Sequence, residues 1–482
     1  MKKQNELVER DATLKNSIFV FIIIIAILMY GILGLGQSAH MPLLFSVMIV
    51  TIYGRCVLKI SLKELEKSIV DSAKEAPFLI LLAIGILIAS WVICGTVPYL
   101  VYLGLKLINP SWFLAFVLLI CTILSTVTGS SWTTCGTLGV AFLGIAMGLN
   151  IPLGMTVAAI VCGAFFGDKQ SPISDYAVFA AGVAKTDIYR HCKYMLYTSG
   201  PSIAISFVIF LILGIKFRGN SNVNLDQVND ITNGLSAAFN FSFWLWIPLI
   251  VLAITIYKKL PATHSLFLSA LSAIIVAIVC QNYDIKDILG MMYSGVVMNT
   301  DNDVVNSICN RGGMTSMTYN MTMLICSLSL GGVLTRTKVL QKIVDKLSNI
   351  IRSRVSLVVS TFVTSTIMSF FTGDPFIGGV IPCNALGDKY ETMDLDRAVL
   401  SRTISDAACV QQPIVPWGVS GVFVAQCFNV PVSQFFGYYF MGFLTPLFGL
   451  ICAITGIGCP KSSVEHDNDN DEKCDENTIA DK

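Results

Sequence analysis

Acidic and hydroxyl side chains gather in two polar segments that interrupt otherwise apolar sequence. The first segment covers residues 125–175 and the second covers residues 369–406; both contain Ser-x-x-Thr-Gly and both end in Ile-Ser-Asp. A carboxylate inside a membrane span costs about 2.5 to 3.5 kcal/mol, so it indicates an ion ligand or a proton relay. Hydroxyl and freed carbonyl oxygens suit a hard cation such as Na⁺. The two segments therefore predict a cation site within a membrane.

The candidate ion-binding or substrate-binding residues are the hydroxyls and carboxylates of these segments. They are Thr128, Ser130, Ser131, Asp168, Ser171, Asp175, Thr372, Asp374, Ser405 and Asp406. Asp168 and Asp406 are expected to hold either a proton or Na⁺, since a shielded carboxylate retains whichever cation neutralises it. Simpler roles compete with these: Asp168 as a surface charge paired with Lys169, and Asp175 and Asp406 as helix caps. Asp374 lies in a Gly-Asp-Pro turn, where Asp is common.

Breaks in apolar sequence at these residues predict non-helical backbone at membrane depth. Thr128-Gly129-Ser130-Ser131 interrupts one apolar stretch and Thr372-Gly373-Asp374-Pro375 interrupts its mate. Such backbone is tolerated only where protein or a water-filled cavity surrounds it. Each break is expected to form the tip of a re-entrant hairpin or the break of a discontinuous helix; a Ser/Thr-rich turn at the membrane surface is the alternative.

The composition predicts an all-α polytopic membrane protein. The chain has 482 residues, 54% of them hydrophobic and only 13% charged, against roughly 25% charged residues in a soluble domain. Ten to thirteen membrane segments are expected, because the interrupted apolar stretches 132–166 and 376–430 allow different numbers of spans. The apolar runs long enough to cross a bilayer are 17–36, 41–58, 77–95, 112–127, 196–215, 241–257, 266–280, 321–334, 355–371 and 435–457.

The charges of the loops indicate two inverted-topology repeats. Segment 59–75 is rich in Lys, whereas its second-half counterpart 283–316 is mainly acidic; segment 335–354 is basic, whereas 96–110 carries only Lys106. Because Lys and Arg collect on the cytoplasmic side, this reversal predicts a duplication with opposite orientation, which places substrate and ion sites near the midplane. Random drift of loop charges is the competing explanation.

The expected organisation follows from these repeats. It comprises a cytoplasmic N-terminal segment, a first membrane repeat, an extracytoplasmic linker, a second membrane repeat and an acidic disordered tail, and both termini are cytoplasmic. The corresponding ranges are 1–16, 17–216, 217–239, 240–457 and 458–482.

Several classes of protein are disfavoured. The chain has no block of Lys and Arg interleaved with aromatic residues for nucleic acid, no metal-like cysteine pairs and no phosphate-binding G-x-x-x-x-G-K-[ST] motif. It also lacks a convincing nucleophile and base for an enzyme. We expect no cofactor and no bound metal beyond transported Na⁺.

At the polar segments the chain resembles the NhaC-type Na⁺/H⁺ antiporter family, part of a larger superfamily of inverted-repeat ion transporters. The matching stretches are Thr-Gly-Ser-Ser-Trp-Thr-Thr-Cys-Gly-Thr from Thr128, Gly-Ala-Phe-Phe-Gly-Asp-Lys-Gln-Ser-Pro-Ile-Ser-Asp from Gly163, and Ser-Arg-Thr-Ile-Ser-Asp from Ser401. The likeness spans roughly residues 17–457 and implies secondary transport driven by Na⁺ or H⁺ gradients. The chain departs from the family pattern at Tyr176-Ala177-Val178, at Gly373-Asp374-Pro375 and at Gly418.

The resemblance predicts Na⁺/H⁺ antiport in the inner cell membrane. Because the family also includes carriers of organic solutes, the alternative is Na⁺-coupled or H⁺-coupled exchange of a small carboxylate or amino acid, as in malate/lactate exchange. A channel is a further alternative. The expected partners are the lipid bilayer, Na⁺ and H⁺, and a homodimer is compatible with the sequence.

Overall fold

The computed structural model describes residues 9–35, 37–74, 78–107, 109–220, 225–258, 260–348 and 351–461. Within these ranges the secondary structure is helical, with no strand. Residues 1–8 of the predicted N-terminal segment and residues 462–482 of the predicted acidic tail lie outside the described residues. Nine of the described helices are long and apolar enough to span a membrane, or up to eleven spans if each of two bent helix pairs counts as one. The predicted all-α membrane fold is confirmed, and the upper count falls within the predicted ten to thirteen segments.

The helices of the first half are α1 (Leu14–Met29), α2 (His40–Cys56), α3 (Leu62–Lys74), α4 (Phe78–Ile93), α5 (Thr96–Leu107), α6 (Pro110–Thr128), α7 (Ser131–Thr134), α8 (Val140–Gly148), α9 (Leu153–Gln170), α10 (Asp175–Val183) and α11 (Ile188–Asn220). Those of the second half are α12 (Leu225–Ala238), α13 (Ile247–Tyr257), α14 (Ala262–Gln281), α15 (Ile285–Ser294), α16 (Asp303–Cys309), α17 (Thr318–Thr337), α18 (Val339–Ser348), α19 (Arg354–Thr372), α20 (Pro375–Thr392), α21 (Arg397–Ile404), α22 (Val419–Phe428), α23 (Val432–Phe435) and α24 (Phe440–Thr455). Short π-helical turns, Cys135–Gly139 and Ser405–Cys409, follow α7 and α21.

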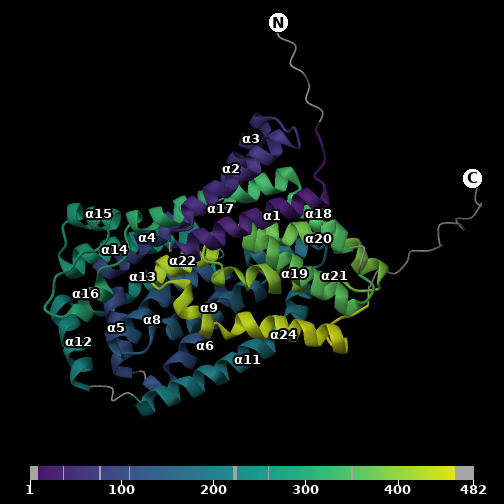
Figure 1. Ribbon diagram of the computed structural model, residues 1–482. Coiled ribbons are helices and arrows are strands. Elements are labelled where there is room, and N and C mark those ends of the chain that lie inside the picture. The colour runs from purple at the N-terminus through teal and green to yellow at the C-terminus, as the bar shows by residue number, and fades with distance from the viewer. Residues whose placement is uncertain are drawn as a thin grey trace, which may run out of the picture.

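Helices from both halves pack together throughout the molecule. In Figure 1, α1, α2 and α17 cross the upper side, α11 and α24 cross the lower side, and α9 and α22 lie between them in this view. The first helices of the chain pack against the second half, since α17 contacts both α2 and α3 while α1 contacts α18. An exposed ion pair reinforces this packing: an Arg336 Nη2 lies 2.7 Å from a Glu64 carboxylate oxygen.

A constant offset of 244 residues relates the central helices of the two halves. The starting residues 110, 153 and 175 of α6, α9 and α10 correspond to the starting residues 354, 397 and 419 of α19, α21 and α22. The same offset matches Gly129 to Gly373 and Pro172 to Pro416. Three helices that begin in register over such a distance are what a duplicated unit produces.

The two Ile-Ser-Asp sequences, however, are not equivalent positions. Ser174 and Asp175 lie at the start of α10, after a break in the helix. Ser405 and Asp406 lie inside a continuous helical stretch that joins α21 to its π-helical turn. The constant offset instead places Gln412 opposite Asp168. The shared Ile-Ser-Asp sequence is therefore a coincidence of short motifs, because the 244-residue offset does not align Asp175 with Asp406.

The region between the two halves is mostly helix. The range 217–239 predicted as a linker contains α12 and the last turn of α11. Beyond it, α13 follows α12 after a bend of 98° between the helices on either side. Helix α12 lies in the expected linker and α13 lies at the start of the second repeat. Only when they are taken together are segments of the two helices long and apolar enough to span a membrane.

Both predicted re-entrant tips are turns centred on a left-handed glycine. Gly129 has φ 67° and Gly373 has φ 68°, a region that costs other L-residues roughly 1 to 2 kcal/mol. A Cβ at Gly129 would lie 2.9 Å from the Ser174 nitrogen, and one at Gly373 would lie 1.8 Å from the Ser327 Oγ. Each tip is therefore restricted to glycine by its conformation and by its neighbours.

We expect Gly129→Ala and Gly373→Ala to lower the stability of the protein by more than the backbone cost of about 1 to 2 kcal/mol, because steric overlap adds to that cost. Thermal unfolding in detergent would measure the change. Gly182→Ala is the matched control, since a Cβ there has nothing within 4 Å and helix α10 favours Ala over Gly. Equal melting temperatures for all three variants would contradict the assignment of the tips.

Candidate functional site

The two hairpin tips meet in one cavity of about 300 Å³, which we call the tip cavity. Gly129 and Ser130 come from the first tip, and Asp374 and Pro375 come from the second. Tips from two different repeats that share a cavity are the arrangement expected of inverted repeats around a transport site. The predicted re-entrant hairpins thus become the two walls of a single site.

The polar lining of the tip cavity is acidic. It consists of Ser130, Asp168, Asp175, Tyr176, Asp374 and Ser420, and none of the lining residues in the described part of the chain is Lys, Arg or His. The carboxylates do not converge on one point: within the described ranges, no group of three His, Cys, Asp or Glu side chains is placed to hold a metal ion. The cavity therefore concentrates negative charge without forming a chelating cluster.

Asp168 is held by two hydroxyl groups from different segments. The Ser131 Oγ donates to Asp168 Oδ2 and the Ser174 Oγ donates to Asp168 Oδ1, each at 2.5 Å. Asp168 lies in the last turn of α9, Ser131 opens α7 behind the first tip, and Ser174 follows the helix break. One carboxylate thus connects the hairpin, the helix and the break. A change in the charge of Asp168 therefore alters hydrogen bonds to the hairpin and to the helix break as well as the end of α9.

The hydroxyls of Thr128 and Thr372 stabilise the tips. The Ser130 N–H donates to Thr128 Oγ1 at 3.2 Å, and the Asp374 N–H donates to Thr372 Oγ1 at 3.3 Å. Neither threonine lines the tip cavity. They hold equivalent turns, which is a structural role, and the ligand role that the sequence suggested for them stays a prediction.

Ser130 and Asp374 are equivalent N-caps. The Ser130 Oγ accepts from the Thr133 N–H at 3.2 Å, and Asp374 Oδ1 accepts from the Phe376 N–H at 2.6 Å. Because caps satisfy helix amino-terminal N–H groups, either side chain would serve. Only the second tip adds a carboxylate, so the two halves of the cavity differ in charge at matching positions.

Asp406 forms an ion pair with Lys169, so its charge is already neutralised by a side chain. Lys169 Nζ lies 2.8 Å from Asp406 Oδ1, and both side chains are almost fully buried. The alternative in which Asp168 pairs with Lys169 is therefore wrong, and so is the one in which Asp406 caps a helix, because it lies inside the π-helical turn. Asp406 lines a smaller cavity of about 170 Å³ with mostly apolar residues. It lies outside the lining of the tip cavity.

Two further predicted ligands are buried away from the tip cavity. The hydroxyls of Ser171 and Ser405 have no hydrogen-bond partner among the described residues, and neither residue lines the tip cavity. Asp175 does line it, from the first turn of α10. There its charge interacts favourably with the helix amino terminus, which agrees in part with its alternative role at a helix start.

The residues that sequence reasoning missed are mainly aromatic, together with one lysine. Trp132, Phe165, Tyr176 and Phe376 line the tip cavity, and the Tyr176 hydroxyl donates to the Pro375 carbonyl at 3.3 Å. Aromatic side chains within apolar sequence are more often packing residues than ligands, so these four gave no chemical signal. Lys169 carries a usable signal, because a lysine within a membrane span needs a buried partner, and its partner is Asp406.

Comparisons of the sequence with known proteins identify one family of transporters. The sequence profile of the Na⁺/H⁺ antiporter family matches residues 163–457. The chain is 33% identical to the Na(+)/H(+) antiporter NhaC of Alkalihalophilus pseudofirmus, over 94% of this chain and 98% of that protein. It is 32% identical to the Malate-2H(+)/Na(+)-lactate antiporter of Bacillus subtilis, over 93% and 96%.

Among solved structures, that of Neisseria gonorrhoeae MtrF matches with a TM-score of 0.41 and 12% identity, over 90% of this chain and 94% of that one.

The family profile and the two sequence relatives confirm the resemblance inferred from the motifs. Both of these relatives are antiporters by name, and they match this chain along nearly its whole length. The chain is a member of the Na⁺/H⁺ antiporter family.

Proposed function

We propose that this protein is a Na⁺/H⁺ antiporter of the cell membrane, with Asp168 as the residue that binds the two ions alternately. The observation that carries the proposal is the tip cavity, which is lined by carboxylates and by no basic side chain among the described residues. Such a cavity attracts cations and repels anions. The relative named as the Na(+)/H(+) antiporter NhaC supports the same activity.

Exchange follows from competition at one carboxylate. Asp168 is only partly exposed, so it is more stable when either a proton or Na⁺ neutralises it. A serine hydroxyl donates one hydrogen bond and offers two lone pairs, so Ser131 and Ser174 can donate to the free carboxylate or rotate to present oxygen to Na⁺. Asp374 and Ser130 would add oxygen atoms from the tips. Since one site holds one ion at a time, release of H⁺ and binding of Na⁺ are coupled.

The membrane location and orientation belong to the same proposal. Lys and Arg are concentrated in the segments that the repeat predicts to be cytoplasmic, which supports cytoplasmic termini. A homodimer remains a proposal about its assembly. The lipid bilayer is its expected surroundings, given the apolar helices long enough to span one.

Reconstitution of the full chain into vesicles without any organic solute tests the activity. An imposed Na⁺ gradient should drive saturable proton movement in the opposite direction, reported by a pH-sensitive dye. Absence of proton movement in correctly inserted protein would overturn the proposal. Ohmic currents through single molecules would instead favour a channel.

Removing the hydroxyls that hold Asp168 should weaken Na⁺ binding. We expect Ser131→Ala and Ser174→Ala each to raise the Na⁺ concentration for half-maximal exchange about tenfold, the effect of losing one hydrogen bond to a charged group. Ser294→Ala is the control, because its hydroxyl bonds to the Gly290 carbonyl on an exposed helix. Unchanged Na⁺ dependence in both serine variants would remove them from the site.

A second candidate function is exchange of an organic acid. The relative named as the Malate-2H(+)/Na(+)-lactate antiporter favours it. The carboxylates of the tip cavity disfavour an anionic solute at that point, unless cations enter with it. If this chain carries an organic acid, the carboxylate of that acid would need a basic side chain outside the tip cavity.

A further inference from the structure

A second polar cavity lies at the other end of α22. Its volume is about 490 Å³, and we call it the Arg311 cavity. Its polar lining consists of Ser307, Asn310, Arg311, Ser316, Gln426 and Asn429. Arg311 is the one charged side chain that the described residues contribute to this lining. The sign of the charge is thus opposite to that of the tip cavity.

Arg311 is firmly positioned and has no carboxylate partner within the described ranges. Its Nε donates to the Ser307 carbonyl at 3.1 Å, an Nη to the Phe428 carbonyl at 3.5 Å, and the other Nη contacts Met147 Sδ at 3.6 Å. No ion pair joins it to an acidic residue in the described part of the chain. A guanidinium has five N–H donors, so donors remain for a ligand.

The backbone holds this arginine in place against α4. The N–H of Gly313 donates to the carbonyl of Gly85 at 2.8 Å, and the N–H of Val296 donates to the carbonyl of Arg311 at 3.4 Å. A guanidinium that is already positioned loses less entropy when it binds a carboxylate in the bidentate geometry that suits it. The neighbouring amides of Asn310 and Gln426 can hydrogen-bond the rest of a small polar solute.

An adjoining cavity of about 450 Å³ shares Met147, Leu153 and Ser307 with the Arg311 cavity and contributes Asp303. An acidic group therefore lies beyond the arginine and not beside it. The combined space offers a cationic end and an anionic end, which suits a solute with a carboxylate at one end and a hydroxyl or amino group at the other. A simple inorganic anion would use only the first.

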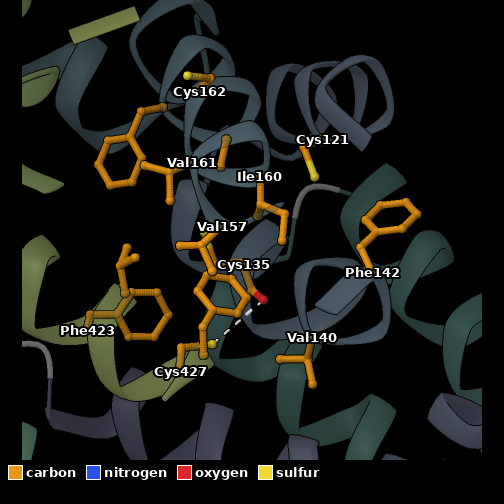
Figure 2. Packing of buried hydrophobic residues seen from close by; sticks show 14 of the residues in the cluster. Cys121, Cys135, Val140, Phe142, Val157, Ile160, Val161, Cys162, Phe423 and Cys427 are labelled. Carbon is orange, nitrogen blue, oxygen red and sulfur yellow. Dashed lines mark hydrogen bonds between the residues drawn. The ribbon is translucent and has the colours of Figure 1, made fainter. Parts of the chain in front are cut away.

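Packed apolar residues separate the Arg311 cavity from the tip cavity. Val419 and Ser420 of α22 line the tip cavity, whereas Gln426 and Phe428 line the Arg311 cavity, about 9 Å further along the helix. Between them, Phe423 stacks on Trp132 with ring centroids 4.4 Å apart. Figure 2 shows the Cys427 side chain beside the Cys135 carbonyl, with the Cys427 Sγ 3.7 Å from the carbonyl oxygen. In this conformation a solute beside Arg311 does not reach Asp168.

We propose that the Arg311 cavity binds the carboxylate of a small organic solute through Arg311. This site goes beyond Na⁺/H⁺ exchange, which needs no organic ligand. It also supplies the basic group that the tip cavity lacks. One helix, α22, contributes to both sites, so movement of α22 would couple occupancy of one to the other.

Calorimetric titration of the full chain in lipid nanodiscs tests the proposal, with L-malate, L-lactate and L-alanine as probes and chloride and phosphate as inorganic anions. We expect at least one organic probe to bind more tightly than either inorganic anion. Arg311→Gln should weaken that binding about tenfold or more, and Arg311→Lys should weaken it less, since charge is kept while the bidentate geometry is lost.

Arg336→Gln is the matched control, because Arg336 pairs with Glu9 and Glu64 outside both cavities; its binding should equal that of the wild type. Size-exclusion profiles identify variants that fail to fold, and the Arg311→Lys variant keeps the test informative in that case. Failure of every organic probe to bind, equal binding of chloride, or unchanged binding in Arg311→Gln would overturn the proposal. Because proton exchange is measured without organic solutes, a failure of the proposed antiport is a separate result.

Discussion

Asp168→Asn should abolish Na⁺-dependent proton movement while leaving the protein folded. A unit charge about 3 Å from Na⁺ contributes roughly 5 kcal/mol at an effective dielectric constant of 20, and half of that already corresponds to about a hundredfold loss of affinity. The asparagine carbonyl can still accept one hydrogen bond from Ser131 or Ser174, so the local structure should persist. Dye-reported proton flux in vesicles, driven by a Na⁺ gradient, measures the loss.

The matched control for this substitution is Asp71→Asn. Asp71 is half-exposed on α3 and pairs with Lys74 at 3.0 Å, so its loss should leave proton flux within the scatter of the wild type. Normal flux in the Asp168→Asn variant would exclude Asp168 as the shared ion site. Loss of flux in both variants would point to a general effect of charge on insertion.

The second large effect concerns the buried pair of Lys169 and Asp406. Removing one partner leaves an uncompensated charge in a low-dielectric interior, which costs about 3 to 5 kcal/mol. We therefore expect Lys169→Met and Asp406→Asn each to lower the melting temperature in detergent sharply and to reduce the yield of folded protein. The two residues come from different repeats, so their separation should loosen the contact between the halves.

Replacing both partners separates stability from transport. The double variant Lys169→Met/Asp406→Leu should regain most of the lost stability, because paired apolar replacements of a buried ion pair are often neutral or stabilising. Since Asp406 lies outside the tip cavity lining, this variant should also retain Na⁺/H⁺ exchange. If the double variant is stable but does not exchange Na⁺ for H⁺, the result would support the role of Asp406 as an ion ligand, which the sequence suggested.

Much of the site was predictable because its residues are costly in a membrane. Glycine followed by hydroxyl and acidic residues within apolar sequence has few structural solutions, and both expected tips formed around Gly129 and Gly373. Asp168, Asp175, Asp374 and Ser130 all line the cavity between those tips. Local chemistry was sufficient here, since an unsatisfied polar group in hydrocarbon must find a cavity or a partner.

The register of the repeat was predictable only in part. The Ser-x-x-Thr-Gly match carries the true offset of 244 residues, whereas the Ile-Ser-Asp match does not. Three-residue identities are too short to distinguish duplication from chance. Helix starts at Pro110, Leu153 and Asp175 with partners at Arg354, Arg397 and Val419 supply the independent register, and they place Gln412 and not Asp406 opposite Asp168.

The sequence by itself determined that this chain is a helical membrane protein with two related halves, glycine-centred tips and acidic residues within apolar sequence. These properties follow from hydropathy, loop charge and backbone conformation, each of which acts locally along the chain. Only the tertiary structure decided that Lys169 neutralises Asp406, that the Thr128 and Thr372 hydroxyls stabilise turns, and that Arg311 faces a cavity of its own. Partner choice among buried charges depends on distances between residues hundreds of positions apart, and folding alone sets those distances.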